Sequence, residues 1–196
     1  MPSRISSPAQ NRKLTSKERR YFPLTPELAS LPLKTDGDFL PKDTVLFVCT
    51  GNTCRSPMCA ALFNDRYAGL TRHAVSAGLA ADGSPISENA VLALEKADVP
   101  SRKPDNDYKS HVSRNVTAEL MQNAAVVVGV TSSHAMQLML RFPAYASKIT
   151  VMPSEISDPF GGNAARYEAC LADIDRALRT AFGFDDSPAD PEGGNV

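Results

Sequence analysis

V-L-F-V-C-T-G-N-T-C-R-S-P-M-C-A-A-L-F, the stretch from Val45 to Phe63, decides the fold. Its four leading apolar residues predict a fully buried β-strand. Pro57 is favoured in the first turn of a helix, and Ser56 before it is predicted to cap the free amides of that helix. The stretch therefore predicts a strand, a tight loop and a helix, with a cysteine and an arginine inside the loop.

The loop has the composition of an anion-binding site. The helix that follows it contributes unpaired N–H groups and the positive end of its dipole. Gly51 and Asn52 tolerate the left-handed backbone that a tightly curled loop requires. Arg55 supplies a planar fork that grips two phosphate oxygens, and the same positive groups favour the nucleophilic thiolate of Cys49. We expect a phosphate or sulfate anion in the loop, with Cys49 facing it.

Three other interpretations of these residues fit less well. Cys49 can be a buried core cysteine, which is a common fate of this residue type. Cys49 and Cys54 can be metal ligands, but no second Cys or Cys/His pair follows at zinc-ligand spacing. A nucleotide-binding Walker loop needs a Gly-Lys-Ser/Thr that is missing here. The sequence therefore favours the anion site, and neither a metal nor a cofactor is expected.

C-T-G-N-T-C-R-S-P after a V-L-F-V strand resembles the phosphate loop of the low-molecular-weight protein phosphatases, and the resemblance runs from about Thr44 to Gly183. It implies that the substrate is a phosphorylated protein and that Cys49 attacks its phosphorus to give a phosphocysteine. It also implies that the remaining loop residues bind the substrate: Thr50, Gly51, Asn52, Thr53, Cys54 and Ser56.

Composition is that of a soluble globular protein with one ordinary core: 196 residues, 42% hydrophobic and 22% charged. The net charge of −1 gives no electrostatic reason to expect nucleic acid or an anionic membrane as a partner. No apolar run is long enough to span a membrane, and no signal-peptide core lies near Met1. Four cysteines are too few for a disulfide scaffold, and a working thiolate needs a reducing compartment, so the cytoplasm is expected.

The ends of the chain differ from its centre. Residues 1–43 hold six of the fifteen prolines and a basic cluster, which predicts a flexible or partly extended N-terminal arm; a docking arm and a targeting peptide are the alternatives. Residues 44–183 form the expected phosphatase domain. Residues 184–196 are acidic and are predicted to be a disordered tail.

Alternating apolar runs and helical patterns predict the architecture. Strands are expected at 45–48, 73–77, 124–130 and 149–152, and helices at 58–67, 86–97, 131–141 and 164–181, with a short helix from Thr117. Such alternation predicts βαβ units and a parallel sheet, hence a three-layer α/β/α sandwich of the flavodoxin or Rossmann-like type. The family resemblance implies the strand order 2-1-3-4.

Ligands of such sheets bind at the carboxyl ends of the strands. This places Cys49, residues 131–134 and residues 157–162 on one rim, so His134 becomes a candidate substrate contact. His111 lies in a segment that resembles a family motif near this rim. Two roles for His111 remain possible: it is a structural histidine, or it makes a supporting contact with the site.

The second chemical motif is S-D-P-F-G-G, residues 157–162. Phosphoryl transfer needs an acid that protonates the leaving group and then a base that activates water, and one carboxyl group can do both. Asp-Pro alone is a turn signal. Together with the anion site, it identifies Asp158 as the candidate acid and base, in a loop that Pro159 stiffens.

The substrate is predicted from Thr53 and Phe160. Tyrosine-directed relatives tend to carry Ile or Leu at the position of Thr53 and two aromatic residues after Asp-Pro. C-T-G-N-T-C-R-S-P, T-x-x-H and D-P-F-G-G instead resemble the bacterial protein-arginine phosphatases. A hydroxyl at Thr53 can bind a guanidinium group or order the attacking water, and Asp158 can accept a hydrogen bond from the same group. Phosphoarginine is therefore favoured, with phosphotyrosine as the alternative.

Two remote functions remain. An arsenate reductase needs two further cysteines to relay a disulfide, and none lies between Cys59 and Cys170. A pseudophosphatase that only binds phosphoproteins would not need the complete set of catalytic residues that is present.

Cys54 has two possible roles. It either packs beneath the loop or traps an oxidised Cys49 as a disulfide.

Overall fold

The computed structural model describes residues 43–68, 72–104 and 106–182. The N-terminal arm up to residue 42, Gly183 and the acidic tail lie outside the described residues.

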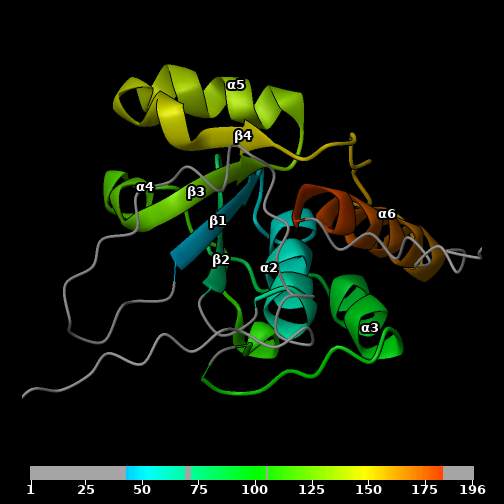
Figure 1. The fold of residues 1–196 in the computed structure, drawn as a ribbon. Coiled ribbons are helices and arrows are strands. Elements are labelled where there is room, and N and C mark those ends of the chain that lie inside the picture. The colour runs from blue at the N-terminus through cyan, green and yellow to red at the C-terminus, as the bar shows by residue number, and fades with distance from the viewer. Residues whose placement is uncertain (1–42, 69–71, 105, 183–196) are drawn as a thin grey trace, which may run out of the picture.

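A four-stranded parallel sheet forms the centre of the described region (Figure 1). Its strands are β1 (Asp43–Cys49), β2 (Arg72–Gly78), β3 (Ala124–Gly129) and β4 (Ile149–Val151), in the order β2-β1-β3-β4. The parallel sheet predicted from the sequence and the order implied by the family resemblance are both confirmed.

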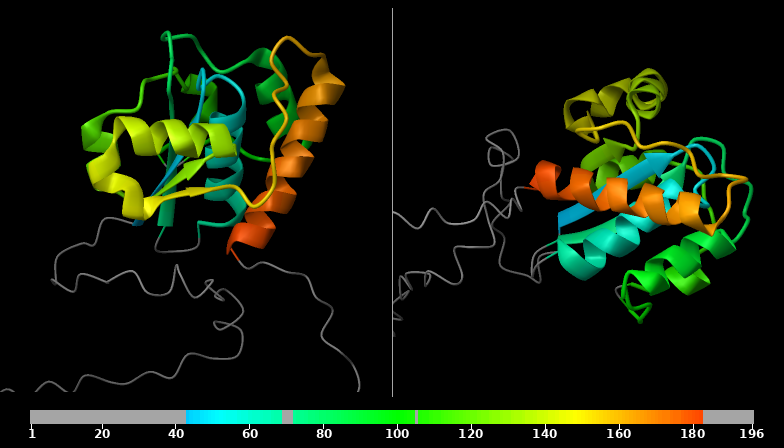
Figure 2. Two further views of the ribbon diagram at one scale, coloured as in Figure 1. Left: turned by 90° about the horizontal axis from the view of Figure 1, so that it is seen from above. Right: turned by 90° about the vertical axis from the view of Figure 1, so that its right-hand side faces the viewer.

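Helices cover both faces of the sheet (Figure 2). One face carries α2 (Arg55–Arg66), α3 (Glu88–Lys96) and α6 (Ala164–Phe182), and the other carries α4 (Ala118–Asn123) and α5 (Ser132–Arg141). Two 3-10 helices, η2 (Tyr108–Ser110) and η3 (Pro143–Lys148), lie in the connections. The three-layer α/β/α sandwich is therefore confirmed.

Strand β1 is buried on both faces, which explains its unbroken apolar run. Val45 and Phe47 pack into the core under α2, α3 and α6, whereas Leu46 and Val48 pack into the core under α4 and α5. Burying a large apolar side chain stabilises the fold by roughly 1.5–3 kcal/mol. The strand that ends at Cys49 is thus held firmly from both sides.

Helix α2 begins at Arg55, three residues before the start at residue 58 that the sequence predicted. Arg55 is its first residue and Cys54 occupies the cap position, without a side-chain cap hydrogen bond. The prediction that Ser56 caps the helix is therefore wrong. Its hydroxyl is buried within the helix's first turn and is used instead for contacts with Asn52, Cys49 and the carbonyl of Ala77.

Two glycines allow neighbouring segments to come close to the carboxyl end of the sheet. A Cβ on Gly78, at the end of β2, would lie 2.6 Å from the carbonyl oxygen of Thr50. A Cβ on Gly129, at the end of β3, would lie 2.5 Å from the amide nitrogen of Ala135. These close approaches place the loop after β1 against β2, and the start of α5 against β3.

Candidate active site

The loop between β1 and α2 opens into a cavity of about 660 Å³ at the carboxyl end of the sheet. The loop residues 49–55 line its base, and the cavity walls come from residues 80–88 and from the segment after β4. The predicted site residues that line this cavity are Cys49, Thr50, Gly51, Asn52, Thr53, Cys54, Arg55, Asp158 and Phe160.

Polar groups converge on the sulfur of Cys49. The amide of Asn52 donates a hydrogen bond to Sγ at 3.3 Å, and the hydroxyl oxygen of Ser56 lies 3.0 Å from Sγ. Ser56 has one hydroxyl hydrogen, which it can donate either to the carbonyl of Ala77 at 3.2 Å or to Sγ. A thiolate can only accept hydrogen bonds, so both the amide and the hydroxyl can stabilise the ionised sulfur.

Asn52 links this loop to strand β2 and to the segment after η2. Its backbone is left-handed, with a φ of 58°. Its side-chain amide donates to the hydroxyls of Ser56 and Ser76 at 2.9 Å each, and its Oδ1 accepts the amide N–H of Arg114 at 3.0 Å. Its carbonyl oxygen lies 2.8 Å from Nε2 of His111. His111 therefore makes the supporting contact that the sequence left open.

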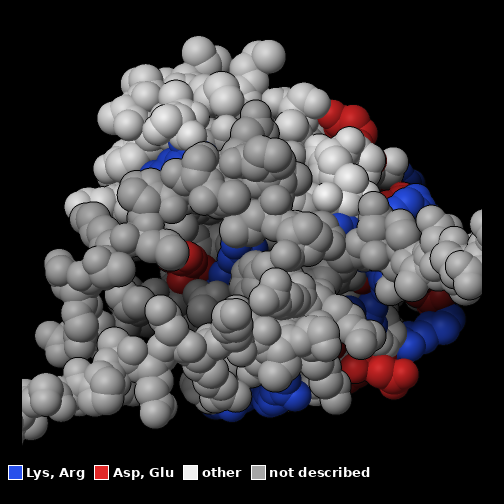
Figure 3. Space-filling model, viewed as in Figure 1, with Lys and Arg blue, Asp and Glu red and all other residues white. Residues whose placement is uncertain are grey.

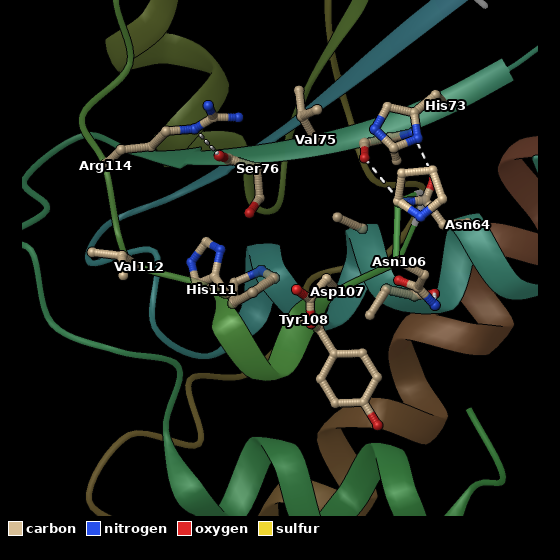
Figure 4. A pocket seen from close by; sticks show the side chains of 15 residues that line it. Asn64, His73, Val75, Ser76, Asn106, Asp107, Tyr108, His111, Val112 and Arg114 are labelled. Carbon is tan, nitrogen blue, oxygen red and sulfur yellow. Dashed lines mark hydrogen bonds between the residues drawn. The ribbon is translucent and has the colours of Figure 1, made fainter. Parts of the chain in front are cut away.

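A second cavity, of about 300 Å³, lies behind the loop, between α2, β2 and residues 104–114 (Figure 4). His111, Ser76 and Arg114 belong both to its wall and to the contacts of Asn52. Burial lowers the pKa of His111; the hydrogen bond to Asn52 acts to raise it, and the nearby Arg114 lowers it again. A neutral His111 must carry its hydrogen on Nε2, because the Asn52 carbonyl can only accept.

Arg55 and Asp158 form an ion pair at the cavity mouth. The guanidinium group of Arg55 also donates to the carbonyl of Ile156 at 3.5 Å, and only 9% of its side chain is exposed. Asp158 is 51% exposed, and its carboxylate accepts the amide N–H of Phe160 at 3.1 Å. Arg166 on α6 donates to the Asp158 carbonyl at 3.0 Å. The carboxylate is thus held beside the guanidinium while remaining accessible from solvent.

Two residues that the sequence did not single out hold the middle of the loop. The amide of Ser87, before α3, donates to the carbonyl of Thr53 at 2.8 Å. The Ser87 hydroxyl donates to the hydroxyl of Tyr167 at 3.0 Å, and that hydroxyl lies 3.3 Å from Sγ of Cys54. Burial and the contact with Cys54 raise the pKa of Tyr167 to about 12. No local sequence signal identifies these contacts, because they join α3 and α6 to a distant loop.

The structure places His134 behind the loop. His134 is 4% exposed and does not line the site cavity. Nε2 lies 3.0 Å from Oγ1 of Thr50, and Nδ1 lies against Thr131. The sequence located His134 on the correct rim but did not show that it contacts the loop instead of the cavity. Ser56 is likewise fully buried beneath the loop.

The two cysteines outside the loop, Cys59 and Cys170, are buried, and burial disfavours their thiolates. Burial raises the pKa of Cys170 to about 12. Burial, followed by the neighbouring Cys170 and Cys49, raises the pKa of Cys59 well above its ordinary value. Thiols of this kind are poor nucleophiles. Cys59 and Cys170 are therefore poor candidates for reactive sulfur chemistry.

The described part of the chain holds no group of three or more His, Cys, Asp or Glu side chains that can bind a metal ion. Within the same residues, no helix combines the length and the apolarity that crossing a membrane requires.

On the face drawn in Figure 3, acidic and basic side chains lie next to one another. Surface ion pairs such as Lys96–Glu168 and Arg66–Asp175 agree with this mixed pattern.

Comparison with known proteins gives consistent matches. The sequence profile described as "Low molecular weight phosphotyrosine protein phosphatase" matches residues 44–183. A protein-arginine-phosphatase of Bacillus subtilis is 32% identical over 145 residues, which cover 69% of this chain and 91% of that protein.

Two solved structures extend the comparison. A mutant of the YwlE arginine phosphatase with a phosphorylated active-site serine has a TM-score of 0.63 and 30% identity, and the match covers 74% of this chain and 97% of that one. A low molecular weight protein tyrosine phosphatase from T. tengcongensis has a TM-score of 0.61 and 32% identity, with 69% of this chain and 95% of that one covered.

The matched profile spans nearly the whole described region, including the four strands, the loop after β1 and the Asp158 segment. The chain therefore belongs to the low molecular weight phosphotyrosine protein phosphatase family and is a hydrolase of the protein phosphatase type.

Proposed function

We propose that this phosphatase hydrolyses phosphoarginine on proteins through a phosphocysteine intermediate. One observation carries the proposal: Cys49 lies at the base of a cavity that Thr53 lines and whose mouth holds the Arg55–Asp158 ion pair. The nucleophile Cys49, the phosphate-binding Arg55 and the acid and base Asp158 thus lie in one site. The same cavity offers a hydroxyl and a carboxylate to a guanidinium group.

The first step transfers the phosphoryl group to the enzyme. The loop amides, the N-terminus of α2 and Arg55 bind the phosphate oxygens. The Cys49 thiolate attacks phosphorus, so that the S–P bond forms while the P–N bond to the guanidinium breaks. Asp158 gives its proton to the departing nitrogen. The products of this step are a phosphocysteine at Cys49 and an arginine side chain without its phosphoryl group.

The second step releases the phosphate. Asp158, now a carboxylate, takes a proton from a water molecule as the water oxygen attacks phosphorus. The P–S bond breaks, which returns the thiolate of Cys49 and frees inorganic phosphate. Ser56 and the amide of Asn52 stabilise the returning thiolate, because both can donate hydrogen bonds to the sulfur.

Specificity for phosphoarginine is attributed to two polar side chains that line the cavity, Thr53 and Asp158. The Thr53 hydroxyl can accept a hydrogen bond from the substrate's guanidinium nitrogens, and the Asp158 carboxyl oxygen that does not carry the proton can accept another. Phe160, which is 74% exposed, is the one aromatic residue that lines the cavity within the described residues. A phenyl ring would therefore meet one aromatic side chain instead of two, beside aliphatic residues such as Pro85 and Ile86.

Phosphotyrosine is the second candidate substrate, because the T. tengcongensis tyrosine phosphatase is as similar in sequence as the arginine phosphatases. A paired assay separates the two. The purified chain is given phosphoarginine-bearing casein and a phosphotyrosine peptide, with Cys49→Ser as the inactive control. We expect a higher kcat/KM for phosphoarginine; a higher value for phosphotyrosine would support the second candidate.

A reducing compartment such as the cytoplasm fits this chemistry. Cys49 must remain a free thiol, and all four cysteines are free in the structure. Hydrolysis of para-nitrophenyl phosphate by the purified chain would separate an enzyme from a phosphoprotein-binding pseudophosphatase, because a binder releases no nitrophenol.

A further inference from the structure

His134 occupies an unusual position between helix α5 and the phosphate-binding loop. It is the third residue of α5, and Thr131 is the residue that caps the helix. The Thr131 side chain accepts the amide N–H of His134, while Nδ1 of His134 accepts the amide N–H of Thr131 at 3.1 Å. The opposite side of the imidazole ring faces the loop, with Nε2 3.0 Å from Oγ1 of Thr50.

This arrangement determines where the ring carries its hydrogen. A backbone N–H can only donate, so Nδ1 must offer a lone pair to Thr131. A neutral imidazole then carries its hydrogen on Nε2, which donates it to Thr50. The other neutral tautomer would set two donors against each other at Thr131 and would leave Nε2 without a hydrogen to donate.

The surroundings keep the ring neutral. Burial lowers the pKa of His134, and Arg55 from α2 lowers it further. Asp158 and Glu155, from the segment after β4, act in the opposite direction but do not outweigh the first two. At neutral pH the Nε2–H form therefore dominates.

Thr50 is the residue next to Cys49, and it is held from two directions. The amide N–H of Ala80 donates to its carbonyl at 2.9 Å, and His134 donates to its hydroxyl at 3.0 Å. The contacts of Asn52 fix the same loop from the side of β2. His134 thus fixes the side of the loop that faces α5.

We propose that His134, in its Nε2–H tautomer, is a positioning residue that holds Thr50 and thereby aligns the Cys49 end of the phosphate-binding loop for catalysis. Its role is not to bind substrate. The proposal rests on the phosphatase function of the loop, but it does not depend on whether the substrate is phosphoarginine or phosphotyrosine.

The variant His134→Asn separates this role from helix capping. The amide oxygen of asparagine can take the place of Nδ1 and accept the N–H of Thr131, but the side chain is too short to reach Thr50. We expect a melting temperature close to that of the wild type and a loss in kcat of about tenfold, the size of one partly buried hydrogen bond. Ser133→Ala, at the exposed neighbouring position of α5, is the control and should retain wild-type kcat.

A double-mutant cycle with Thr50→Val shows whether the two residues act through each other. Valine keeps the shape of threonine but cannot accept a hydrogen bond. We expect Thr50→Val to lose about as much kcat as His134→Asn, and the double variant to lose no more than either single one. Independent, multiplicative losses would overturn the proposal, as would a His134→Asn variant with wild-type kcat.

Nitrogen NMR of the imidazole rings gives a test that needs no turnover. The chain has three histidines, so the signal missing from His134→Asn assigns His134. We expect a protonated Nε2 and an unprotonated Nδ1 at neutral pH; the reverse would overturn the proposal. If the wild type failed to hydrolyse para-nitrophenyl phosphate, the proposed function would fail, whereas full activity in His134→Asn would reject the role of His134 alone.

Discussion

Asp158 is the residue whose environment most restricts the proposed chemistry. Its carboxylate pairs with Arg55 and accepts the amide of Phe160, yet half of the side chain stays exposed. A group that must first donate a proton and then accept one needs this access to both the substrate and water. The ion pair also keeps the carboxylate close to the phosphate-binding loop.

Removing this carboxylate should affect substrates unequally. We expect Asp158→Ala to lower kcat by roughly 10²–10⁴-fold on substrates with poor leaving groups. The loss should be smaller for phosphoenzyme formation from para-nitrophenyl phosphate, because nitrophenolate departs without a proton. Rapid-mixing kinetics of both substrates measures the difference. Equal losses in phosphoenzyme formation would show that Asp158 only holds Arg55 in place.

Thr53 should determine the choice between the two substrate classes. Thr53→Ile removes a hydroxyl from the cavity wall and adds apolar surface, so kcat/KM should shift from phosphoarginine toward phosphotyrosine. A change of roughly 1–3 kcal/mol in discrimination corresponds to about a five- to 150-fold shift. Thr53→Ser, which keeps the hydroxyl, is the matched control. If Thr53→Ser shifted kcat/KM between the two substrates by the same amount, the hydroxyl group could not be the cause of the preference.

At the scale of single elements, the loop depends on its contact with strand β2. A Cβ at Gly78 would come within 2.6 Å of the Thr50 carbonyl and 3.0 Å of the Asn52 Cβ, distances that force the loop to move. Gly78→Ala should therefore lower activity by at least tenfold and cost roughly 1–3 kcal/mol of stability, as overpacking usually does. Kinetics and urea unfolding measure both effects, with the exposed Gln122→Ala on α4 as control. Wild-type kcat in Gly78→Ala would contradict this account.

The sequence predicted the strands and helices more accurately than it predicted the contacts of individual side chains. Apolar runs such as 45–48 and 124–130 identified their strands because burial on both faces leaves no polar position. Ser56 was misplaced as a helix cap, since its buried hydroxyl is drawn to Asn52 and Cys49. His134 was located on the right rim, but its direction depends on tertiary contacts that spacing alone cannot reveal.

The least predictable contacts are those between distant segments. Asn52 takes its partners from β2 and from residues 111–114, and Cys54 takes Tyr167 from α6. A single sequence shows that Asn52 suits a left-handed turn, but it does not show what its side chain will meet. The catalytic loop is thus a local motif whose shape is held by the rest of the domain.

At the scale of the whole molecule, Asp175 joins α6 to α2. Its carboxylate accepts hydrogen bonds from Tyr67 at 2.6 Å, Arg66 at 3.3 Å and, within α6, Arg179 at 3.1 Å. Partial burial acts to raise the pKa of Asp175, but these hydrogen bonds and charges outweigh it and lower the pKa below its ordinary value. A carboxylate with a lowered pKa stabilises the fold above its unfolded-state pKa, and that stability is lost as the pH falls through the folded-state value.

Acid should therefore weaken the domain in part through Asp175. We expect the free energy of unfolding to fall as the pH drops from about 5 to about 2, around the ordinary aspartate pKa. Asp175→Asn should cost about 1 kcal/mol at pH 7, a modest value because the site is partly exposed. Its stability should also vary less with pH. Parallel slopes for both proteins in urea unfolding would exclude Asp175 as a source of the acid sensitivity.

The central claim is that phosphoarginine loses its phosphoryl group to Cys49. Mixing the purified enzyme with a phosphoarginine-bearing protein, quenching within milliseconds and mapping the enzyme's peptides by mass spectrometry tests it most directly. The account predicts one added phosphoryl group, carried by Cys49 in the wild type, at a level that decays as free phosphate appears. Turnover of phosphoarginine by Cys49→Ser at the wild-type rate, or a phosphoryl group on any residue other than Cys49, would contradict it.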